Sequence, residues 1–207
     1  MQVYSIGTGP IGTNTYLAYD EETMKGFLVD PGAYGKNVSE KINEMGIDIQ
    51  YILLTHGHGD HIMGVPGFKE DFPDAKVVAH VEEEGMLMDF RFNMSEQFGQ
   101  PTSITADIYV EDGDHLQCGG IDMEFLYTPG HSPGGMCIYI AAEKVLFSGD
   151  TLFRASIGRT DFPGCSFPEL RDAIHNKLWP LPDDTKVYPG HMGPTDIGFE
   201  KENNPFV

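Results

Sequence analysis

One short segment of this chain carries an unusual density of groups that bind metal ions. The segment Thr55–His61 reads Thr-His-Gly-His-Gly-Asp-His and places four potential ligands within six residues. In a continuing strand alternate side chains share a face, so His56 and His58 are expected to point together. The intervening glycines let the backbone turn and bring Asp60 and His61 to the same centre. Neutral imidazole suits zinc, iron and manganese, and a carboxylate adds a harder oxygen ligand. The spacing predicts a metal site.

Three further segments each place one ligand-type side chain just after a predicted strand and a glycine. They are Gly130-His131, Gly149-Asp150 and Gly190-His191. Each dipeptide alone is typical of an ordinary turn. Together with the first segment they give five histidines and two aspartates at strand ends, which indicates convergence on one edge of a sheet. Seven ligands exceed what one tetrahedral zinc takes, so the pattern predicts two metal ions.

Short apolar and β-branched runs would position these loops. The predicted strands are Gln2–Ser5, Thr15–Tyr19, Gly26–Val29, Ile49–Thr55, Lys76–Ala79, Met123–Tyr127, Met136–Ile140, Lys144–Ser148 and Lys186–Tyr188. The predicted helices are Lys36–Met45, Val81–Asp89 and Phe167–Lys177, the last capped by Ser166. This mixture favours sheets covered by helices over a strict βαβ alternation. Residues 90–106 show no clear periodicity and are predicted as either a lid-like loop or a helix.

Composition excludes several classes of partner. The chain has 207 residues with 13 Lys+Arg against 32 Asp+Glu, a net charge of −19. Such a surface repels phosphate backbones and anionic lipid, so neither nucleic acid nor a membrane is an expected partner. Three widely spaced cysteines predict no disulfide framework. Without a recognisable leader or a long apolar run, we expect a cytoplasmic protein whose single domain covers residues 1–207.

The ligand segments, taken in order, resemble those of the metallo-β-lactamase fold hydrolases. The stretches Gly149–Phe153 and Gly158–Phe162 resemble the glyoxalase II (hydroxyacylglutathione hydrolase) branch. The resemblance implies an α+β fold, an αββα sandwich of two mixed β-sheets flanked by helices. It also implies a partition of the ligands in which one metal is held by His56, His58 and His131, the other by Asp60, His61 and His191, and both by a bridging Asp150.

The same resemblance implies a chemistry. Two divalent metal ions, zinc first with iron or manganese as alternatives, would hold a bridging hydroxide beside the catalytic residues Asp60 and Asp150. This hydroxide would hydrolyse a small-molecule thioester such as S-lactoylglutathione, or a related ester. Arg159 matches the cation that binds the glycine carboxylate of glutathione in the family, and an ion pair with Asp161 is the alternative interpretation.

Two departures from the family leave the substrate open to other thioesters or esters. The family commonly has a tyrosine where this chain has Asp161. Only 207 − 191 = 16 residues follow His191, so the helical C-terminal domain of longer members is not expected. A second activity also fits the pattern: the persulfide dioxygenases of the same fold would hold one iron with His56, His131 and Asp150. The sequence makes no prediction of oligomeric state.

Overall fold

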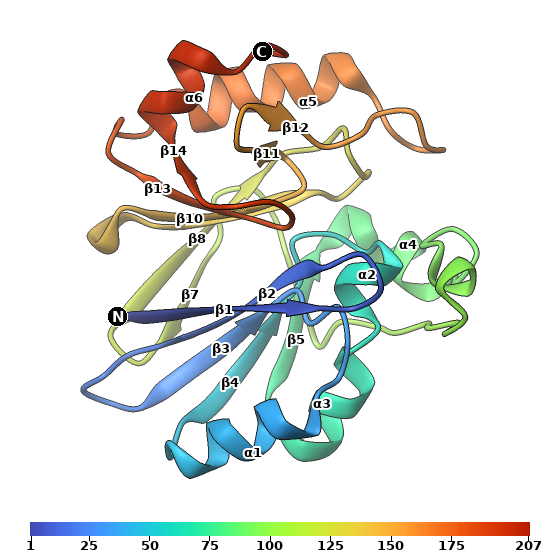
Figure 1. The fold of residues 1–207 in the computed structure, drawn as a ribbon, viewed down its shortest axis with the longest axis vertical. Coiled ribbons are helices and arrows are strands. Elements are labelled where there is room, and N and C mark those ends of the chain that lie inside the picture. Colours follow the sequence, from blue (N-terminus) through green and yellow to red (C-terminus); the bar gives the residue numbers. More distant parts are fainter.

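The computed structural model describes residues 1–207 as four layers, with two β-sheets face to face and helices on their outer sides (Figure 1). The strands of the first sheet are, in spatial order, β1 (Gln2–Thr8), β2 (Thr13–Tyr19), β3 (Lys25–Val29), β4 (Asp48–Leu53), β5 (Lys76–His80) and β6 (Ile108–Val110). Those of the second sheet are β14 (Thr195–Asp196), β13 (Lys186–Pro189), β10 (Val145–Gly149), β9 (Met136–Ile140), β8 (Ile121–Tyr127) and β7 (His115–Cys118). A separate hairpin joins β11 (Leu152–Phe153) to β12 (Ser156–Ile157).

Short helices cover both outer faces. The helices are α1 (Lys36–Glu44), α2 (Gly59–Ile62), α3 (Val65–Asp71), α4 (Glu84–Met88), α5 (Phe167–Ala173) and α6 (Ile197–Asn203). Figure 1 shows α1 and α3 beneath the first sheet and α5 and α6 above the second. Short 3₁₀ turns occupy Val81–Glu83, Ser95–Phe98 and Ala141–Glu143, and one π-helical turn occupies Ile174–Leu178. This is the αββα sandwich of two mixed sheets that the resemblance implies.

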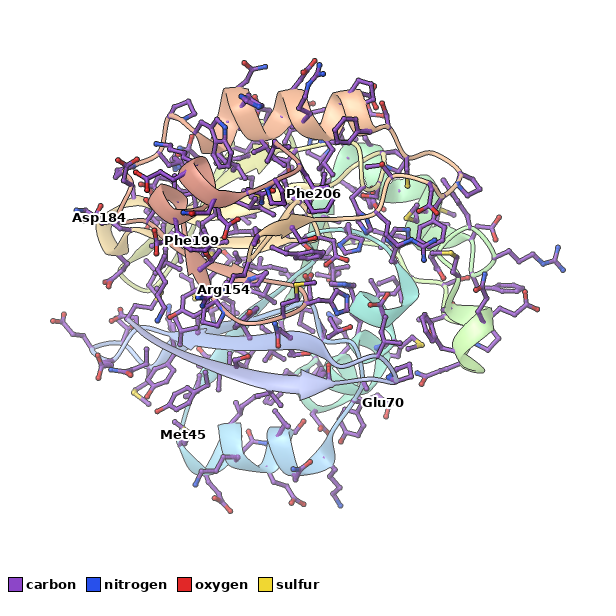
Figure 2. All side chains as sticks on the ribbon, turned by 45° about the horizontal axis from the view of Figure 1, so that its top comes forward. Met45, Glu70, Arg154, Asp184, Phe199 and Phe206 are labelled. Carbon is purple, nitrogen blue, oxygen red and sulfur yellow. The ribbon has the colours of Figure 1, made fainter.

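Alternating side chains hold the layers together, and they fill the space between the sheets and between sheets and helices (Figure 2). In β3, Phe27 and Val29 pack into the core between the sheets, whereas Leu28 packs outward under the helices. The second sheet behaves alike, since Phe147 of β10 faces the first sheet and Leu146 faces α5 and α6. Both faces of these strands are covered, which explains why their sequences read as continuous apolar runs rather than as alternation. No helix is both long and apolar enough to cross a membrane.

Every predicted strand is present, although one boundary matters for the site. The strand predicted to reach Thr55 ends at Leu53, so His56 and His58 stand in a loop and not on one face of a strand. Their convergence therefore comes from the loop conformation. The cysteines are free, as predicted.

The predicted helices are present but shorter or divided. The predicted helix Val81–Asp89 begins as a 3₁₀ turn, in which the His80 ring accepts a hydrogen bond from Glu82 N, and becomes α4. The last predicted helix changes from α5 to a π-helical turn after Ala173, and its cap is confirmed because Ser166 Oγ accepts from Glu169 N. Residues 90–106 form a loop with one 3₁₀ turn, not a helix.

Several elements have no bounds predicted from the sequence. They are the short strands β6, β7, β11, β12 and β14 and the helices α2, α3 and α6. Strands of two to four residues carry too little pattern of their own, and neighbouring strands supply their hydrogen bonds. Pro66 and Gly67 near the start of α3 conceal that helix, since both residues are usual in turns.

Strand direction explains why the ligand loops meet. In the second sheet β10 runs parallel to β13, and β8 runs in the same direction because both β8 and β10 are antiparallel to β9. Their carboxyl ends therefore lie at the same edge. In the first sheet β4 runs parallel to its neighbours β3 and β5. The loops after β4, β8, β10 and β13 carry the predicted ligands.

Candidate metal centre

The side chains that the sequence predicts as ligands meet at one end of the two sheets. His56 and His58 lie in the loop after β4, and Asp60 and His61 lie in α2. The loops after β8, β10 and β13 supply His131, Asp150 and His191. All are buried except His191, whose side chain is 20% exposed.

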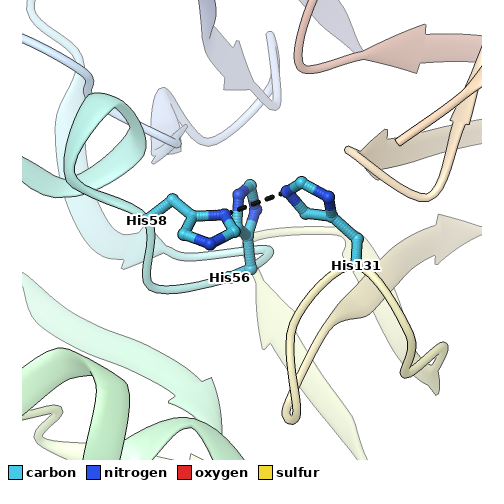
Figure 3. A group of neighbouring side chains, drawn as sticks. All are labelled: His56, His58 and His131. Carbon is cyan, nitrogen blue, oxygen red and sulfur yellow. Dashed lines mark hydrogen bonds between the residues drawn. The ribbon is translucent and has the colours of Figure 1, made fainter. Parts of the chain in front are cut away.

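His56, His58 and His131 form one cluster, here called the three-histidine group (Figure 3). One nitrogen of each ring lies within 4.8 Å of the others. His58 Nδ1 and His131 Nε2 are 2.9 Å apart, and the centroids of the His56 and His131 rings are 4.8 Å apart. Imidazoles that face one point in this way are a ligand set that suits zinc or iron.

Asp60, His61 and His191 form a second cluster, here called the mixed group. One ligand atom of each residue again lies within 4.8 Å of the others. Asp60 Oδ2 lies 3.2 Å from His191 Nε2 and 3.4 Å from His61 Nε2. The group therefore offers a carboxylate oxygen beside two nitrogens, which is a harder donor set than three imidazoles.

Asp150 lies between the two groups and contacts both. Its Oδ2 is 3.5 Å from His131 Nε2 in the three-histidine group and 3.5 Å from His191 Nε2 in the mixed group. Its Oδ1 is 3.4 Å from His61 Nε2. The preceding Gly149 adopts φ +49°, a left-handed conformation that glycine tolerates. This turn at the end of β10 sets the carboxylate within reach of both clusters.

Three ligand-type atoms are buried without a hydrogen-bond partner. They are His56 Nε2, His61 Nε2 and Asp150 Oδ1. Leaving a buried polar atom unpaired costs about 1–3 kcal/mol, so three such atoms in one place indicate that a bound group satisfies them. Cations between these side chains would do so. The residues fit a metal centre, and two groups with a carboxylate between them are consistent with a dinuclear one.

Electrostatics keeps the three-histidine group neutral. Burial, followed by the nearby His131, lowers the pKa of His58 to about 3. Burial also lowers the pKa of His56 and of His131. A metal binds the neutral imidazole, so these rings are held in the ligating form.

The mixed group is charged instead. Burial opposes a charge on His61, but the carboxylates of Asp60, Asp150 and Asp30 outweigh it and hold the pKa of His61 well above its usual value. Burial likewise opposes ionisation of Asp60, but His61 and His191 hold its pKa well below the usual range. Asp60 is therefore a stable carboxylate.

Asp30 supports this centre and was missed in the sequence. Its Oδ2 lies 3.0 Å from His61 Nδ1, and its carboxylate accepts from Thr55 N at 2.8 Å and from Thr55 Oγ1 at 2.6 Å. Asp30 also clusters with His56 and His61, but its oxygens are already bonded, so we assign it the role of orienting His61. The signal was present, because Asp30 directly follows β3 much as Asp150 follows β10.

Two further contacts orient ligands. The carbonyl oxygen of Arg159 lies 2.8 Å from His131 Nδ1, and Thr13 Oγ1 donates to Asp60 Oδ2 at 2.9 Å. Gly158 lies so close to the Asp150 backbone and the His131 ring that no Cβ would fit there. The backbone around Arg159 thus shapes the three-histidine side of the centre.

A cavity of about 480 Å³ opens above the centre. Five of the predicted ligands reach it, and His56 and His61 lie behind them. The rest of the wall is mainly apolar, formed by Ile11, Met94, Phe98, Phe153, Phe162 and Met192. Residues 90–106, whose role the sequence left open, supply Met94 and Phe98. A larger hollow of about 700 Å³ lies between α1 and the first sheet, and it holds no metal-ligating side chain.

Arg159 borders the cavity, but its guanidinium is paired. Its Nε and a terminal nitrogen donate to the two carboxylate oxygens of Asp161 at 2.9 and 2.8 Å. The same guanidinium lies 4.1 Å from the centroid of the Phe162 ring. The ion pair that the sequence offered as the alternative is therefore present, and substrate binding by Arg159 stays a prediction.

Comparison with known proteins agrees with this architecture. Residues 8–191 match the family model of the metallo-β-lactamase superfamily. The chain is 37% identical over 201 residues to "probable metallo-hydrolase YqgX" of Bacillus subtilis, covering 96% of this chain and 94% of that protein. It is 34% identical over 198 residues to the hydroxyacylglutathione hydrolase GloC of Haemophilus influenzae, covering 94% and 92%.

Solved structures give the same result. The B3 metallo-β-lactamase BLEG-1 superposes with a TM-score of 0.92 at 38% identity and covers 99% of both chains. TTHA1623, solved in a di-iron-bound form, superposes with a TM-score of 0.86 at 32% identity and covers 99% of this chain and 100% of its own. By sequence and by fold, this chain belongs to the metallo-β-lactamase superfamily.

Proposed function

We propose that this chain is a metal-dependent hydrolase of a thioester, or of a related ester, and that it works with two metals. The observation that carries the proposal is Asp150, whose carboxylate lies 3.4–3.5 Å from ligand nitrogens of both groups. When bound, a pair of divalent metals lowers the pKa of water from 15.7 to about 7 and polarises the carbonyl under attack. Zinc and iron both suit the donor set, and the similarity to TTHA1623 favours testing iron beside zinc.

The chain itself fixes which nitrogen faces the centre in three of the five histidine rings. His61 Nδ1–H donates to Asp30, which leaves His61 Nε2 for a metal. Because the Thr55 hydroxyl donates to Asp30, it accepts from His56 Nδ1–H and leaves His56 Nε2 free. The Arg159 carbonyl accepts from His131 Nδ1–H and leaves His131 Nε2 free. Such partners set the tautomer of a ligand before the metal arrives.

Asp60 and Asp150 are the carboxylates that we place beside the reacting water. Both line the cavity, and Thr13 holds one oxygen of Asp60. The low pKa of Asp60 keeps it ionised at neutral pH, so it accepts a hydrogen bond from water and orients it. The apolar side chains of the cavity wall would lie against the substrate and displace water from it.

Two features support a thioester as the bond that is cleaved. GloC, 34% identical across nearly the whole chain, is named as a hydroxyacylglutathione hydrolase. The cavity has an apolar wall for an acyl or carrier chain and one cation, Arg159, at its rim. We place a carboxylate of the substrate beside Arg159, in competition with Asp161.

A β-lactam amide is the second candidate. It is favoured by the similarity to BLEG-1, a B3 metallo-β-lactamase, over 99% of both chains. A persulfide dioxygenase with one iron is the third candidate. Its expected ligands lie together, because His131 and Asp150 are in contact and His56 is beside them.

Elemental analysis followed by a substrate panel tests the proposal. The purified protein is assayed for metal content and then given S-lactoylglutathione, a thioester without charged groups, a β-lactam, and glutathione persulfide with oxygen uptake. We expect two metals per chain and thioester hydrolysis. His58→Ala should abolish hydrolysis, and His115→Ala, at an exposed histidine on β7, should retain it. One iron with oxygen uptake on the persulfide, or turnover of the β-lactam alone, would overturn thioester hydrolysis.

A further inference from the structure

Glu83 is a fully buried carboxylate outside the ligand set. It ends the 3₁₀ turn Val81–Glu83 after β5, and it does not line the cavity. Its Oε1 accepts from Gly57 N at 2.7 Å. Its Oε2 accepts from Gly134 N at 2.5 Å and from Ser132 Oγ at 3.2 Å. Both oxygens are thus committed to the protein, and neither is available to a substrate.

The three donors belong to the two loops that carry the three-histidine group. Gly57 separates His56 from His58, and Ser132 follows His131. A single side chain therefore joins the loop after β4 to the loop after β8. Both glycine N–H groups are buried, and Glu83 is their hydrogen-bond acceptor.

The approach between Glu83 and these loops is close. A Cβ on Gly57 would lie 3.2 Å from Glu83 Oε1, and one on Gly134 would overlap the Glu83 backbone. Burying a carboxylate is unfavourable, and burial raises the pKa of Glu83 to about 7 against the three hydrogen bonds that lower it. An apolar side chain at this position could not accept from the three donors and would leave two buried N–H groups without a partner.

We infer that Glu83 is a positioning residue that fixes the separation of the two loops and so assembles the three-histidine group. The inference rests on the proposed metal centre. A glutamine in its place has one acceptor oxygen, and its NH₂ would face an N–H of one loop. Shortening the side chain, as in aspartate, would leave one loop out of reach.

The effect should be confined to one group. The mixed group takes its support from Asp30 and Thr13. Asp60 and His61 follow Gly57 by three and four residues but lie in α2, and His191 lies in the loop after β13. Loss of Glu83 should therefore weaken metal binding at the three histidines and leave binding at Asp60, His61 and His191 nearly unchanged.

Titration with Co²⁺ in two backgrounds tests this selectivity. His191→Ala keeps the three-histidine group whole, and His58→Ala keeps the mixed group whole. Adding Glu83→Gln should weaken Co²⁺ binding by about 10- to 100-fold in the first background. In the second background binding should stay within about twofold. Glu84→Gln, the same change at the exposed neighbour, is the matched control and should change neither.

The outcomes separate positioning from a general structural role. Equal weakening in both backgrounds, or no weakening in either, overturns the inference. If Glu83→Gln does not fold by circular dichroism, Ser132→Ala removes one of the three donors and should give a smaller loss with the same selectivity; an unselective loss overturns the inference. Parent proteins that bind no Co²⁺ overturn the metal centre itself, and with it the role of Glu83.

Discussion

The three-histidine group and the mixed group lie side by side, yet they are built on opposite electrostatics. In the first, burial lowers the pKa of every ring, as for His58 at about 3. In the second, carboxylates hold the pKa of His61 well above its usual value. A cation in the three-histidine group would meet neutral ligands and keep more of its charge, whereas one in the mixed group would be partly neutralised by Asp60. One end of the two sheets therefore carries two neighbouring groups of ligand-type side chains that differ in charge.

Asp150→Ala should have the largest effect because Asp150 belongs to both environments. Its removal takes the shared carboxylate from His131 on one side and from His61 and His191 on the other. We expect hydrolysis to fall by more than about 100-fold, beyond the usual loss for a residue that only supports a ligand. Steady-state rates and metal content by mass spectrometry are the measurements.

The control for this variant is Asp74→Ala, at an exposed aspartate far from the ligands in sequence, which should keep full rate and metal content. Retained hydrolysis with full metal content in Asp150→Ala would reject the bridging role. Loss of metal from one group alone would show that the two environments are independent.

Asp30→Asn should weaken the mixed group more than the three-histidine group, because Asp30 contacts His61 directly and reaches His56 only through Thr55. Asparagine keeps the size of the side chain, but its NH₂ would face a donor, either His61 Nδ1–H or the Thr55 hydroxyl. We expect Co²⁺ affinity at the mixed group to fall about 10- to 100-fold, measured in the His58→Ala background. Asp30→Asn is the counterpart at the mixed group of Glu83→Gln at the three-histidine group. An equal loss of Co²⁺ affinity at both groups would show that the two groups do not depend on different supporting residues.

The metal-free protein should show the opposite charges of the two groups as opposite pH dependence. The folded pKa of His58 lies below its unfolded value of 6.5, so the unfolded state binds the extra proton as the pH falls. Stability from His58 is present above pH 6.5 and is lost on acidification by about 1.4 kcal/mol per pH unit. The folded pKa of His61 is raised, so its contribution is present below pH 6.5 and is lost as the pH rises through the folded pKa.

Urea unfolding in chelator at pH 8 and pH 5 measures both effects. The destabilisation caused by His58→Asn should shrink from pH 8 to pH 5, whereas that caused by His61→Asn should grow. If both variants change in the same direction, the two groups do not differ in charge as described.

The sequence predicts the ligands of this centre better than their supports. Segment Thr55–His61 is dense enough to be recognised locally, and the remaining ligands each follow a strand and a glycine. Asp30 and Glu83 act on partners 25 to 51 residues away. Asp30 follows a strand as Asp150 does, but nothing near either supporting residue in the sequence indicates which partners it contacts. The division of the ligands into two groups came from the family resemblance and not from spacing.

In the fold as well, elements that depend on distant partners are harder to predict than elements defined by their own residues. Strands such as β3 and β10 were predicted because their own apolar residues fill two cores. β6 and β14 were not, because their pairing partners hold them in place. The predicted strand would have placed His56 and His58 on one face. In the structure the strand ends at Leu53, and the conformation of the following loop brings the rings together.

Asp161→Asn should have the smallest effect, on the substrate rather than on the metals. Asp161 holds the guanidinium of Arg159, whose carbonyl serves the three-histidine group. The paired side chains are 64% and 66% exposed, so solvent screens the ion pair and it contributes little. Freeing the cation should lower KM for S-lactoylglutathione by up to about fivefold and leave kcat, and KM for an uncharged thioester, unchanged.

Asp184→Asn removes a similarly exposed ion pair, with Lys144 and outside the cavity lining, and should change no kinetic constant. If Asp161→Asn changes KM equally for charged and uncharged thioesters, Arg159 does not receive a carboxylate. If it changes kcat instead, the disturbance has passed through the Arg159 carbonyl to His131. The pattern of the two constants therefore shows which end of Arg159, its guanidinium or its backbone, connects the cavity wall to the three-histidine side of the centre.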